Sequence, residues 1–216
     1  MIKFWWVRHA PVIGNHNRCY GNNEVDCDVS DKCSFKNIAS ILPKNANVYT
    51  SNLSRTIKTF NATVEEGLVY RKHIIDCRLV EQDLGAYSGI KYNELESLIK
   101  KKNAYDKNWL MSYSHQPPNG ESFYQLCKRV IQFIDEILLK FSVKNIIIFS
   151  HGGPIRAAIS YAINYNIKKV IAIEIQNSKV SLIQYDKNRE GKLLFINKLL
   201  LPCSNIRHTF PWLLKF

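Results

Sequence analysis

Short apolar segments recur along the chain and alternate with longer amphipathic ones. Ile2–Val7 and Asn145–Phe149 are almost continuously apolar, which is typical of strands covered on both faces of a sheet. Helices between such strands favour a mainly parallel sheet. Further strands are predicted at Val48–Thr50, Ile74–Asp76, Val170–Glu174, Val180–Tyr185 and Leu193–Leu199.

The amphipathic segments have the periodicity of helices. Ser122–Lys140 shows it most clearly, because Leu126, Val130 and Phe133 recur at helical spacing and share one face. The other predicted helices are Ser30–Leu42, Leu53–Glu66, Tyr92–Lys101 and Pro154–Tyr165. The alternation of these elements predicts a three-layer α/β/α sandwich around a mainly parallel central sheet.

A length of 216 residues is enough for one well-packed domain and marginal for two, so we expect a single domain over residues 1–216. Residues Asn103–Gly120 are polar and aromatic and end in two prolines, an asparagine and a glycine, a composition typical of loops. Loops at the mouth of a sheet often carry binding residues. We therefore expect a lid or a pocket rim inserted around residues 82–120.

The distribution of apolar residues indicates no membrane or secretion segment. No apolar run approaches the roughly 20 residues that a membrane-spanning helix needs, and the apolar start of the chain is too short for a signal peptide. We therefore expect a cytoplasmic protein without a membrane partner. The six cysteines form no Cys-x-x-Cys pair, so we expect reduced thiols and no zinc site.

The chain is strongly basic, with 30 Lys and Arg against 18 Asp and Glu and a formal charge of +12. This charge fits nucleic acid or an anionic membrane as a partner, or a basic surface around a pocket for an anionic small molecule. The only dense basic run, at Lys100–Lys102, lies near the end of a predicted helix, where cations are favourable. Because no nucleic-acid-binding motif accompanies the charge, we favour the small-molecule pocket.

Two of the apolar strands are followed directly by a histidine. Arg8 and His9 follow the first strand, and Ser150 and His151 follow a later one. Enzymes with α/β folds place their chemistry at this end of parallel strands. The glycine pair that begins at Gly152 opens a helix, whose free N–H groups attract phosphate and other anions. A tight turn beside structural histidines would give the same pattern.

Two further charged residues stand beside predicted strands. Arg55 lies in the first turn of a helix, where a cation opposes the helix dipole and is better explained by a grip on an anion. Glu81 follows a strand and precedes Gly85 and Gly89, which indicate a compact turn. Taken alone, each charged residue could equally be a solvent-exposed surface side chain.

These segments together resemble the histidine phosphatase superfamily, which is also called phosphoglycerate-mutase-like. The matching positions occur in the family's order along most of the chain. They are Arg8-His9, Asn15, Ser51 with Arg55, Leu79 with Glu81, Gly85 and Gly89, Gly120-Glu121-Ser122, and Ser150-His151-Gly152-Gly153. Ala10 and Tyr87 replace the family's usual glycine and tryptophan. Because neither is charged, they bear on substrate fit rather than on the chemistry.

The resemblance implies a metal-independent phosphomonoesterase that needs no cofactor. His9 would attack phosphorus and become a phosphohistidine, and Glu81 would act as general acid and base. Arg8, Arg55 and His151 would surround the phosphoryl group and supply the charge stabilisation that its transfer requires. The two arginines should also lower the pKa of His9 and keep it neutral for attack.

The resemblance also implies the substrate class, a small phosphorylated metabolite. The expected substrate-binding residues are Arg8, Asn15, Tyr20, Gly21, Arg55 and Gly152. The residues after Glu81 resemble the phosphatase branch, and the segment around Tyr20 resembles α-ribazole-phosphate phosphatase-like members, so α-ribazole 5'-phosphate is one expected substrate. Phosphoglycerate-mutase-type transfer and a non-catalytic phosphate-binding protein on the same fold are the alternatives. Either a monomer or a homodimer fits the sequence.

Overall fold

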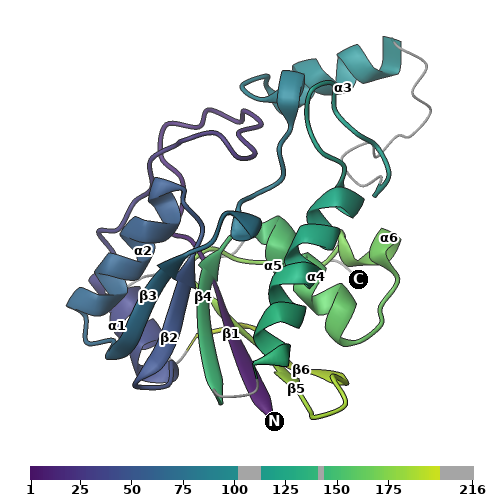
Figure 1. Ribbon diagram of the computed structural model, residues 1–216. Helices are drawn as coiled ribbons and strands as arrows, with labels where there is room; N and C mark the ends of the chain where they lie inside the picture. Colours follow the sequence, from purple (N-terminus) through teal and green to yellow (C-terminus); the bar gives the residue numbers. More distant parts are fainter. Residues whose placement is uncertain (102–112, 141–143, 200–216) are drawn as a thin grey trace, which may run out of the picture.

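A single sheet forms the centre of the molecule. The computed structural model describes residues 1–101, 113–140 and 144–199. Within them, six strands are ordered β3-β2-β4-β1-β5-β6 across the sheet (Figure 1). Their bounds are β1 Ile2–Arg8, β2 Ala46–Thr50, β3 Tyr70–Ile75, β4 Asn145–Ser150, β5 Val180–Tyr185 and β6 Gly191–Lys198. The strands β1 to β4 form parallel pairs and β5 and β6 antiparallel ones, so the predicted mainly parallel sheet is confirmed.

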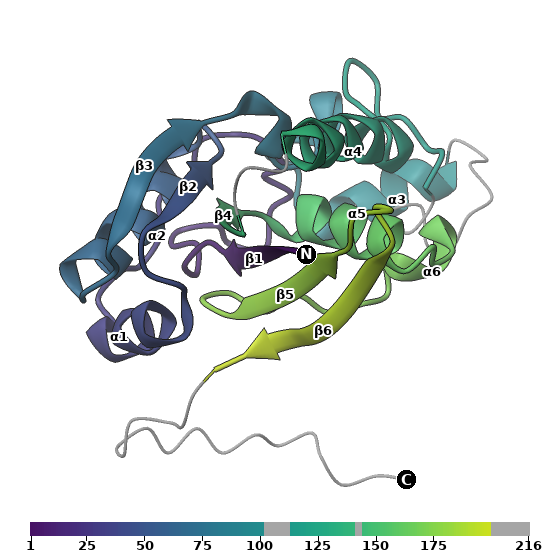
Figure 2. The same ribbon diagram turned by 60° about the horizontal axis from the view of Figure 1, so that its bottom comes forward.

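Helices cover both faces of this sheet. Their bounds are α1 Lys32–Ile41, α2 Ser54–Glu65, α3 Tyr92–Lys101, α4 Phe123–Leu139, α5 Gly152–Ala162 and α6 Ile167–Val170, with short 3-10 turns η1 Cys77–Leu79 and η2 Gly85–Tyr87. Helices α1 and α2 pack on one face, and α4 and α5 pack on the other (Figure 2). The predicted three-layer sandwich is therefore confirmed. None of the described helices is long and apolar enough to cross a membrane.

Alternate residues of the central strands fill two cores. On β1, Phe4 and Trp6 belong to the core shared with α4 and α5, whereas Val7 belongs to the core under α1 and α2. The neighbouring strand β4 divides in the same way between Ile148 and Ile147. Burying one such side chain contributes about 1.5–3 kcal/mol. Burial on both faces explains why these two strands are continuously apolar in sequence.

The prediction of a strand at Val170–Glu174 is wrong. Its first residue ends the short helix α6, and the N–H of Ile173 then bonds the carbonyl of Val170 at 3.0 Å in a turn. Asn166 starts that helix by accepting from the N–H of Lys168. The apolar side chains of this segment pack on the α4 and α5 core and not in the sheet, because β5 occupies the place beside β1.

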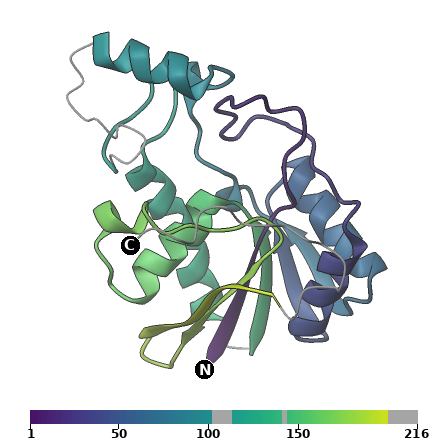
Figure 3. The ribbon, with the colours of Figure 1, turned by 180° about the vertical axis from the view of Figure 1, so that it is seen from behind.

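Helix α3 and its flanking segments stand above the carboxyl ends of the parallel strands, beside the loop that follows β1 (Figure 3). A small separate core of Cys19, Leu84 and Leu95 joins that loop to α3. The N–H of Ala86 bonds the carbonyl of Pro118 at 2.8 Å, which ties the two ends of this region together. Residues 102–112 of the predicted insertion lie outside the described residues. Its role as a lid or a pocket rim stays a prediction.

One cysteine departs from the expected reduced state. Cys33 is disulfide-bonded, so the expectation of six reduced thiols is wrong. The cysteines with free thiols in the described part of the chain are Cys19, Cys27, Cys77 and Cys127.

Candidate active site

The two histidines meet because their strands are neighbours. Strands β1 and β4 pair in parallel with Arg8 opposite Ser150, so each histidine is the first residue beyond its strand. The N–H of His9 bonds the carbonyl of Ser150 at 3.0 Å, which continues the pairing by one residue. The rings of His9 and His151 consequently lie with their centroids 5.1 Å apart.

The ring of His9 is held in one tautomer. Its Nδ1 lies 2.7 Å from the carbonyl oxygen of Ala10. A carbonyl can only accept, so Nδ1 carries the proton and Nε2 keeps a free electron pair. The peptide after His9 is fixed in turn, because the N–H of Ala10 donates to Thr59 Oγ1 at 2.8 Å and Asn177 Nδ2 donates to the carbonyl of His9 at 2.8 Å. The arrangement presents Nε2 as a nucleophile.

His9 is neutral at physiological pH. Its side chain is 1% exposed. Burial lowers its pKa from 6.5 to about 3, with further lowering by the charges of Arg8 and Arg55 and an opposing contribution from the hydrogen bond to Ala10. The two arginines therefore act as predicted, but burial is the larger cause.

His151 is completely buried and has both ring nitrogens engaged. Arg55 Nε donates to its Nδ1 at 3.2 Å, so the proton lies on Nε2, which donates to Ser51 Oγ at 2.8 Å. Burial, and then the nearby His9 and Arg55, hold the pKa of His151 well below its usual value. In this state Nδ1 has no proton to donate. A hydrogen bond from Nδ1 to a phosphoryl oxygen would therefore require Nδ1 to gain a proton when an anion binds.

Arg55 lies at the bottom of the site with no exposed surface. Its Nη1 donates to the carbonyl of Asn23 at 2.7 Å, and its Nη2 donates to the carbonyl of Gly21 at 2.8 Å. The guanidinium also lies 5.3 Å from the centre of the Tyr20 ring. Arg55 thus anchors the loop after β1 over the histidines, and a guanidinium has further N–H groups for an anion.

A cavity of about 230 Å³ opens beside this cluster. Of the residues predicted from sequence, those that line it are Arg8, Tyr20, Gly21, Glu81 and Gly152. Arg8 Nη1 donates to the carbonyl of Ile175, whereas its Nε is buried without a hydrogen-bond partner among the described residues. A buried charged donor left unpaired is unfavourable. An anion in the cavity would satisfy it.

Glu81 occupies the N-terminus of α5. Its carboxylate oxygens accept from the N–H of Gly153 at 3.1 and 3.2 Å, and Oε1 also accepts from the N–H of Gln82 at 2.9 Å. A Cβ on Gly153 would come within 2.2 Å of Glu81 Oε1, so only glycine permits this contact. The helix N-terminus that was predicted to attract an anion is therefore present, and the Glu81 carboxylate already accepts from one of its N–H groups.

The comparison with protein families agrees with this geometry. The model of the histidine phosphatase superfamily (branch 1) matches residues 4–198. The chain belongs to this superfamily. The resemblance stated from the sequence motifs is thereby confirmed.

Curated proteins with different names resemble this chain. Phosphoserine phosphatase 1 from Hydrogenobacter thermophilus is 25% identical over 207 residues, which are 94% of each chain. A 2,3-bisphosphoglycerate-dependent phosphoglycerate mutase from Methanococcus vannielii is 29% identical over 115 residues, 50% of this chain and 49% of the mutase. The match to the bifunctional protein Rv2228c from Mycobacterium tuberculosis is 23% identical and covers 58% of this chain and 34% of that protein. The chain thus spans half or less of several curated relatives.

Solved structures support the fold. A putative alpha-ribazole-5'-P phosphatase from Escherichia coli superposes with a TM-score of 0.78 at 19% sequence identity, covering 94% of this chain and 99% of that one. At this identity the likeness concerns the fold, which is that of phosphoglycerate-mutase-like histidine phosphatases.

Some placements differ from the residue list predicted from sequence. His9, Arg55 and His151 are buried and are not among the residues that line the cavity. Asn15 does not line it either; its carbonyl accepts from the N–H of Arg18 at 2.9 Å. Arg156, which was not predicted, lines the cavity with Arg8, and its Nε donates to the carbonyl of Ile173 at 2.7 Å. The signal for Arg156 was its helical spacing, since it follows Gly152 by one turn of α5 and shares its face.

Proposed function

We propose that this chain is a phosphomonoesterase that works through a phosphohistidine at His9. The observation that carries the proposal is the state of His9. Its Nδ1–H is bonded to a carbonyl, its pKa is lowered to about 3, and its Nε2 keeps a free electron pair. Arg8, the next residue, has an Nε with no hydrogen-bond partner in the described part of the chain, which supports a phosphoryl group as the ligand.

In the first half of the reaction, the phosphoryl group lies between the arginines and His9. His9 Nε2 attacks phosphorus, a P–N bond forms, and the P–O bond to the substrate alcohol breaks. Glu81 gives its proton to the leaving oxygen, which otherwise departs as an unstable alkoxide. Arg8 and Arg55 stabilise the charge that gathers on the remaining phosphoryl oxygens.

In the second half, water replaces the alcohol. Glu81, now a carboxylate, takes a proton from the water while the water oxygen attacks phosphorus, and the P–N bond breaks. The products are inorganic phosphate and neutral His9. Within the described part of the chain, no group of three His, Cys, Asp or Glu side chains is placed to hold a metal ion. The arginines provide positive charge at this site in the proposed metal-independent mechanism.

The proposed substrate is a small phosphorylated metabolite. Tyr20, Tyr92 and Phe123 give the cavity an aromatic wall, while Arg156 adds a second cation beside Arg8. An aromatic wall suits a nucleoside-like alcohol. Together with the name of the Escherichia coli neighbour, this supports α-ribazole 5'-phosphate as the first substrate to assay. Phosphoserine is the second, since a relative of the same length is a phosphoserine phosphatase.

Phosphoglycerate mutase activity is the second candidate function. It is favoured by the mutase from Methanococcus vannielii, although that match covers 50% of this chain. A non-catalytic phosphate-binding protein is the remaining alternative. The presence of Glu81 at the cavity, with the buried His9 directly after the cavity-lining Arg8, is against it. We propose no nucleic-acid partner, and the monomer or homodimer and the cytoplasmic location stay predictions.

A hydrolysis assay tests the proposal. The protein in EDTA is given p-nitrophenyl phosphate, α-ribazole 5'-phosphate, phosphoserine and 3-phosphoglycerate, with His9→Ala in parallel. We expect phosphate release by the wild-type chain and loss of about 10³-fold or more in the variant. Full activity of His9→Ala or a requirement for added metal would contradict the mechanism, and isomerisation of 3-phosphoglycerate faster than hydrolysis would assign the chain to the mutases.

A further inference from the structure

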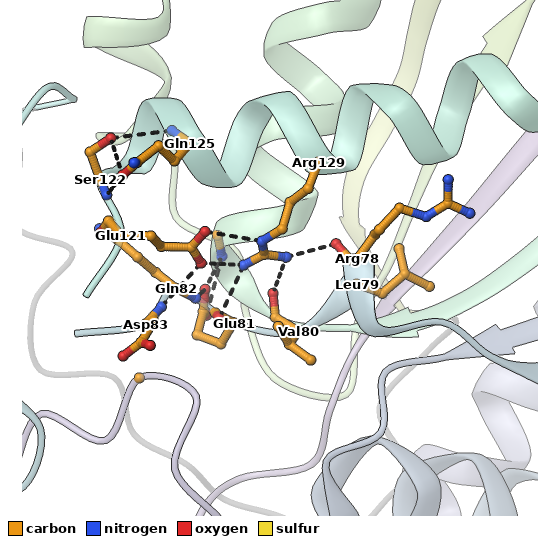
Figure 4. A network of polar contacts seen from close by, with 12 residues as sticks. Arg78, Leu79, Val80, Glu81, Gln82, Asp83, Glu121, Ser122, Gln125 and Arg129 are labelled. Carbon is orange, nitrogen blue, oxygen red and sulfur yellow. Dashed lines mark hydrogen bonds and ion pairs between the residues drawn. The ribbon is translucent and has the colours of Figure 1, made fainter. Parts of the chain in front are cut away.

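We propose that Arg129 and Glu121 form a clamp that positions Glu81 for its proton transfer; this inference rests on the proposed function. Neither residue lines the cavity. Figure 4 shows them between helix α4 and the segment that carries Glu81. The clamp acts on the backbone around Glu81, so both members are positioning residues rather than catalytic ones.

Arg129 reaches from α4 to the backbone immediately before and at Glu81. Its Nη1 donates to the carbonyl of Arg78 at 2.7 Å and to that of Val80 at 2.8 Å. Its Nη2 donates to the carbonyl of Glu81 itself at 3.2 Å (Figure 4). One guanidinium therefore fixes three peptide units that end at Glu81. Lysine could not reproduce this planar set of donors.

Glu121 holds both Arg129 and the backbone that follows Glu81. It accepts from Arg129 Nε at 3.1 Å and from Nη2 at 2.5 Å. Its Oε1 also accepts from the N–H of Asp83 at 3.1 Å, while its own N–H donates to the carbonyl of Asp83 at 2.9 Å. The side chain of Gln82 adds a third link, donating to the carbonyl of Glu121 at 2.9 Å. Glu81 is thus held on both sides.

The segment needs such a clamp because it belongs to no helix or strand. Residues 80–84 lie between the turns η1 and η2 and lack the hydrogen bonds of regular structure. The anchor itself is firm, since Ser122 and Gln125 form a capping box at the start of α4, directly after Glu121. The ion pair is also mostly shielded from water, with the side chains of Arg129 and Glu121 exposed by 18% and 20%.

A purely structural ion pair and a positioning clamp predict different kinetics. Proton donation matters when the leaving group is an alkoxide and matters little for p-nitrophenolate, which is stable as an anion. A displaced Glu81 should therefore lower kcat/KM for an alkyl phosphate much more than for p-nitrophenyl phosphate. The ratio of the two kcat/KM values is measured on one sample, so it does not depend on the fraction of folded protein.

The experiment measures this ratio for the wild-type chain, Arg129→Gln, Glu121→Gln and the double variant, with ribose 5-phosphate as the alkyl phosphate. The Glu81→Gln variant gives the ratio of the two kcat/KM values that is expected when the general acid is absent. Arg78→Gln is the matched control. Arg78 lies on the same segment as Glu81, but its side chain pairs with Asp76 and with Glu136 of α4, and none of the three lines the cavity. We expect each clamp variant to lower the ratio about tenfold or more, and the double variant to add little, since the pair acts as one unit.

A ratio within about threefold of the wild-type value in Arg129→Gln, or losses that multiply in the double variant, would overturn the clamp. A wild-type chain that hydrolyses neither substrate, or a Glu81→Gln variant with an unchanged ratio, would instead overturn the proposed function. The two failures are therefore distinguishable.

Discussion

Ser51 and His151 are joined by a hydrogen bond of 2.8 Å between Oγ and Nε2, although they lie 100 residues apart in the chain. Together with Arg55 at Nδ1, the serine fixes the ring orientation and tautomer of His151. A fixed ring keeps Nδ1 beside Arg55, and Nδ1 can donate to a bound phosphoryl group once it has gained a proton. This contact gives the first prediction.

Ser51→Ala should weaken catalysis without removing any group from the cavity. Without the Oγ acceptor, His151 can rotate or change tautomer, and we expect kcat to fall by about 10–100-fold. Steady-state kinetics on p-nitrophenyl phosphate measures the change. The matched control is Ser54→Ala on the same segment, because Ser54 bonds Glu24 and not a histidine. Equal rates for the two variants would count against a role for the contact.

The lowered pKa of His9 should make stability depend on pH. The folded state holds His9 neutral down to about pH 3, whereas the unfolded chain binds a proton below its ordinary value of 6.5. The free energy of unfolding is therefore not reduced by His9 protonation above pH 6.5, and it decreases as pH falls from 6.5 toward 3. The expected loss is about 2 kcal/mol between pH 6.5 and 5. Urea unfolding at several pH values should show a smaller loss for His9→Gln, and an equal loss would contradict the assignment.

Gly153→Ala should displace Glu81, the proposed general acid. The added Cβ would lie 2.2 Å from Glu81 Oε1 and 2.9 Å from Leu126 Cδ1, so the carboxylate must leave the α5 N-terminus. We expect kcat/KM for an alkyl phosphate to fall by about 10²-fold, with a smaller fall for p-nitrophenyl phosphate. Thermal unfolding checks that the variant is folded. Unchanged hydrolysis of the alkyl phosphate would show that Glu81 acts without this contact.

Arg156→Gln should change substrate preference more than chemistry. Arg156 is a second cation in the cavity, so it favours substrates with another anionic group besides the phosphate. We expect KM for phosphoserine to rise about tenfold, and KM for p-nitrophenyl phosphate to change less. Arg71→Gln, an exposed arginine on β3, is the control. Parallel changes in both KM values would place Arg156 at the reacting phosphate instead.

The sequence predicted the sheet and the two histidines at the ends of its strands because both depend on local patterns. The strands β1 and β4 are buried on both faces, and that burial requires the continuous apolar sequence from which they were predicted. Val170–Glu174 shows the limit of the same argument. A short apolar run packs equally well as a helical turn, and only the place taken by β5 beside β1 decides between them.

The contacts within the site could not be predicted, since they join distant residues. Nothing near Arg55 in sequence indicates that it holds the carbonyls of Gly21 and Asn23. The sequence also named charge as the cause of the low pKa of His9, because neighbouring arginines are visible in a sequence and depth of burial is not. Arg129 was missed for a similar reason. It donates to backbone carbonyls, which every residue has, so the sequence does not single out its partners.

The central claim is that phosphate passes through His9. The most direct measurement is to mix the chain with a radiolabelled phosphomonoester, quench in alkali, where phosphohistidine survives, and map the label by peptide mass spectrometry. We predict label on the peptide at His9, more of it in Glu81→Gln because water attack is slowed, and none in His9→Ala. Label on a different residue, or rapid turnover by the wild-type chain with no labelled protein in either the wild type or Glu81→Gln, would contradict the account.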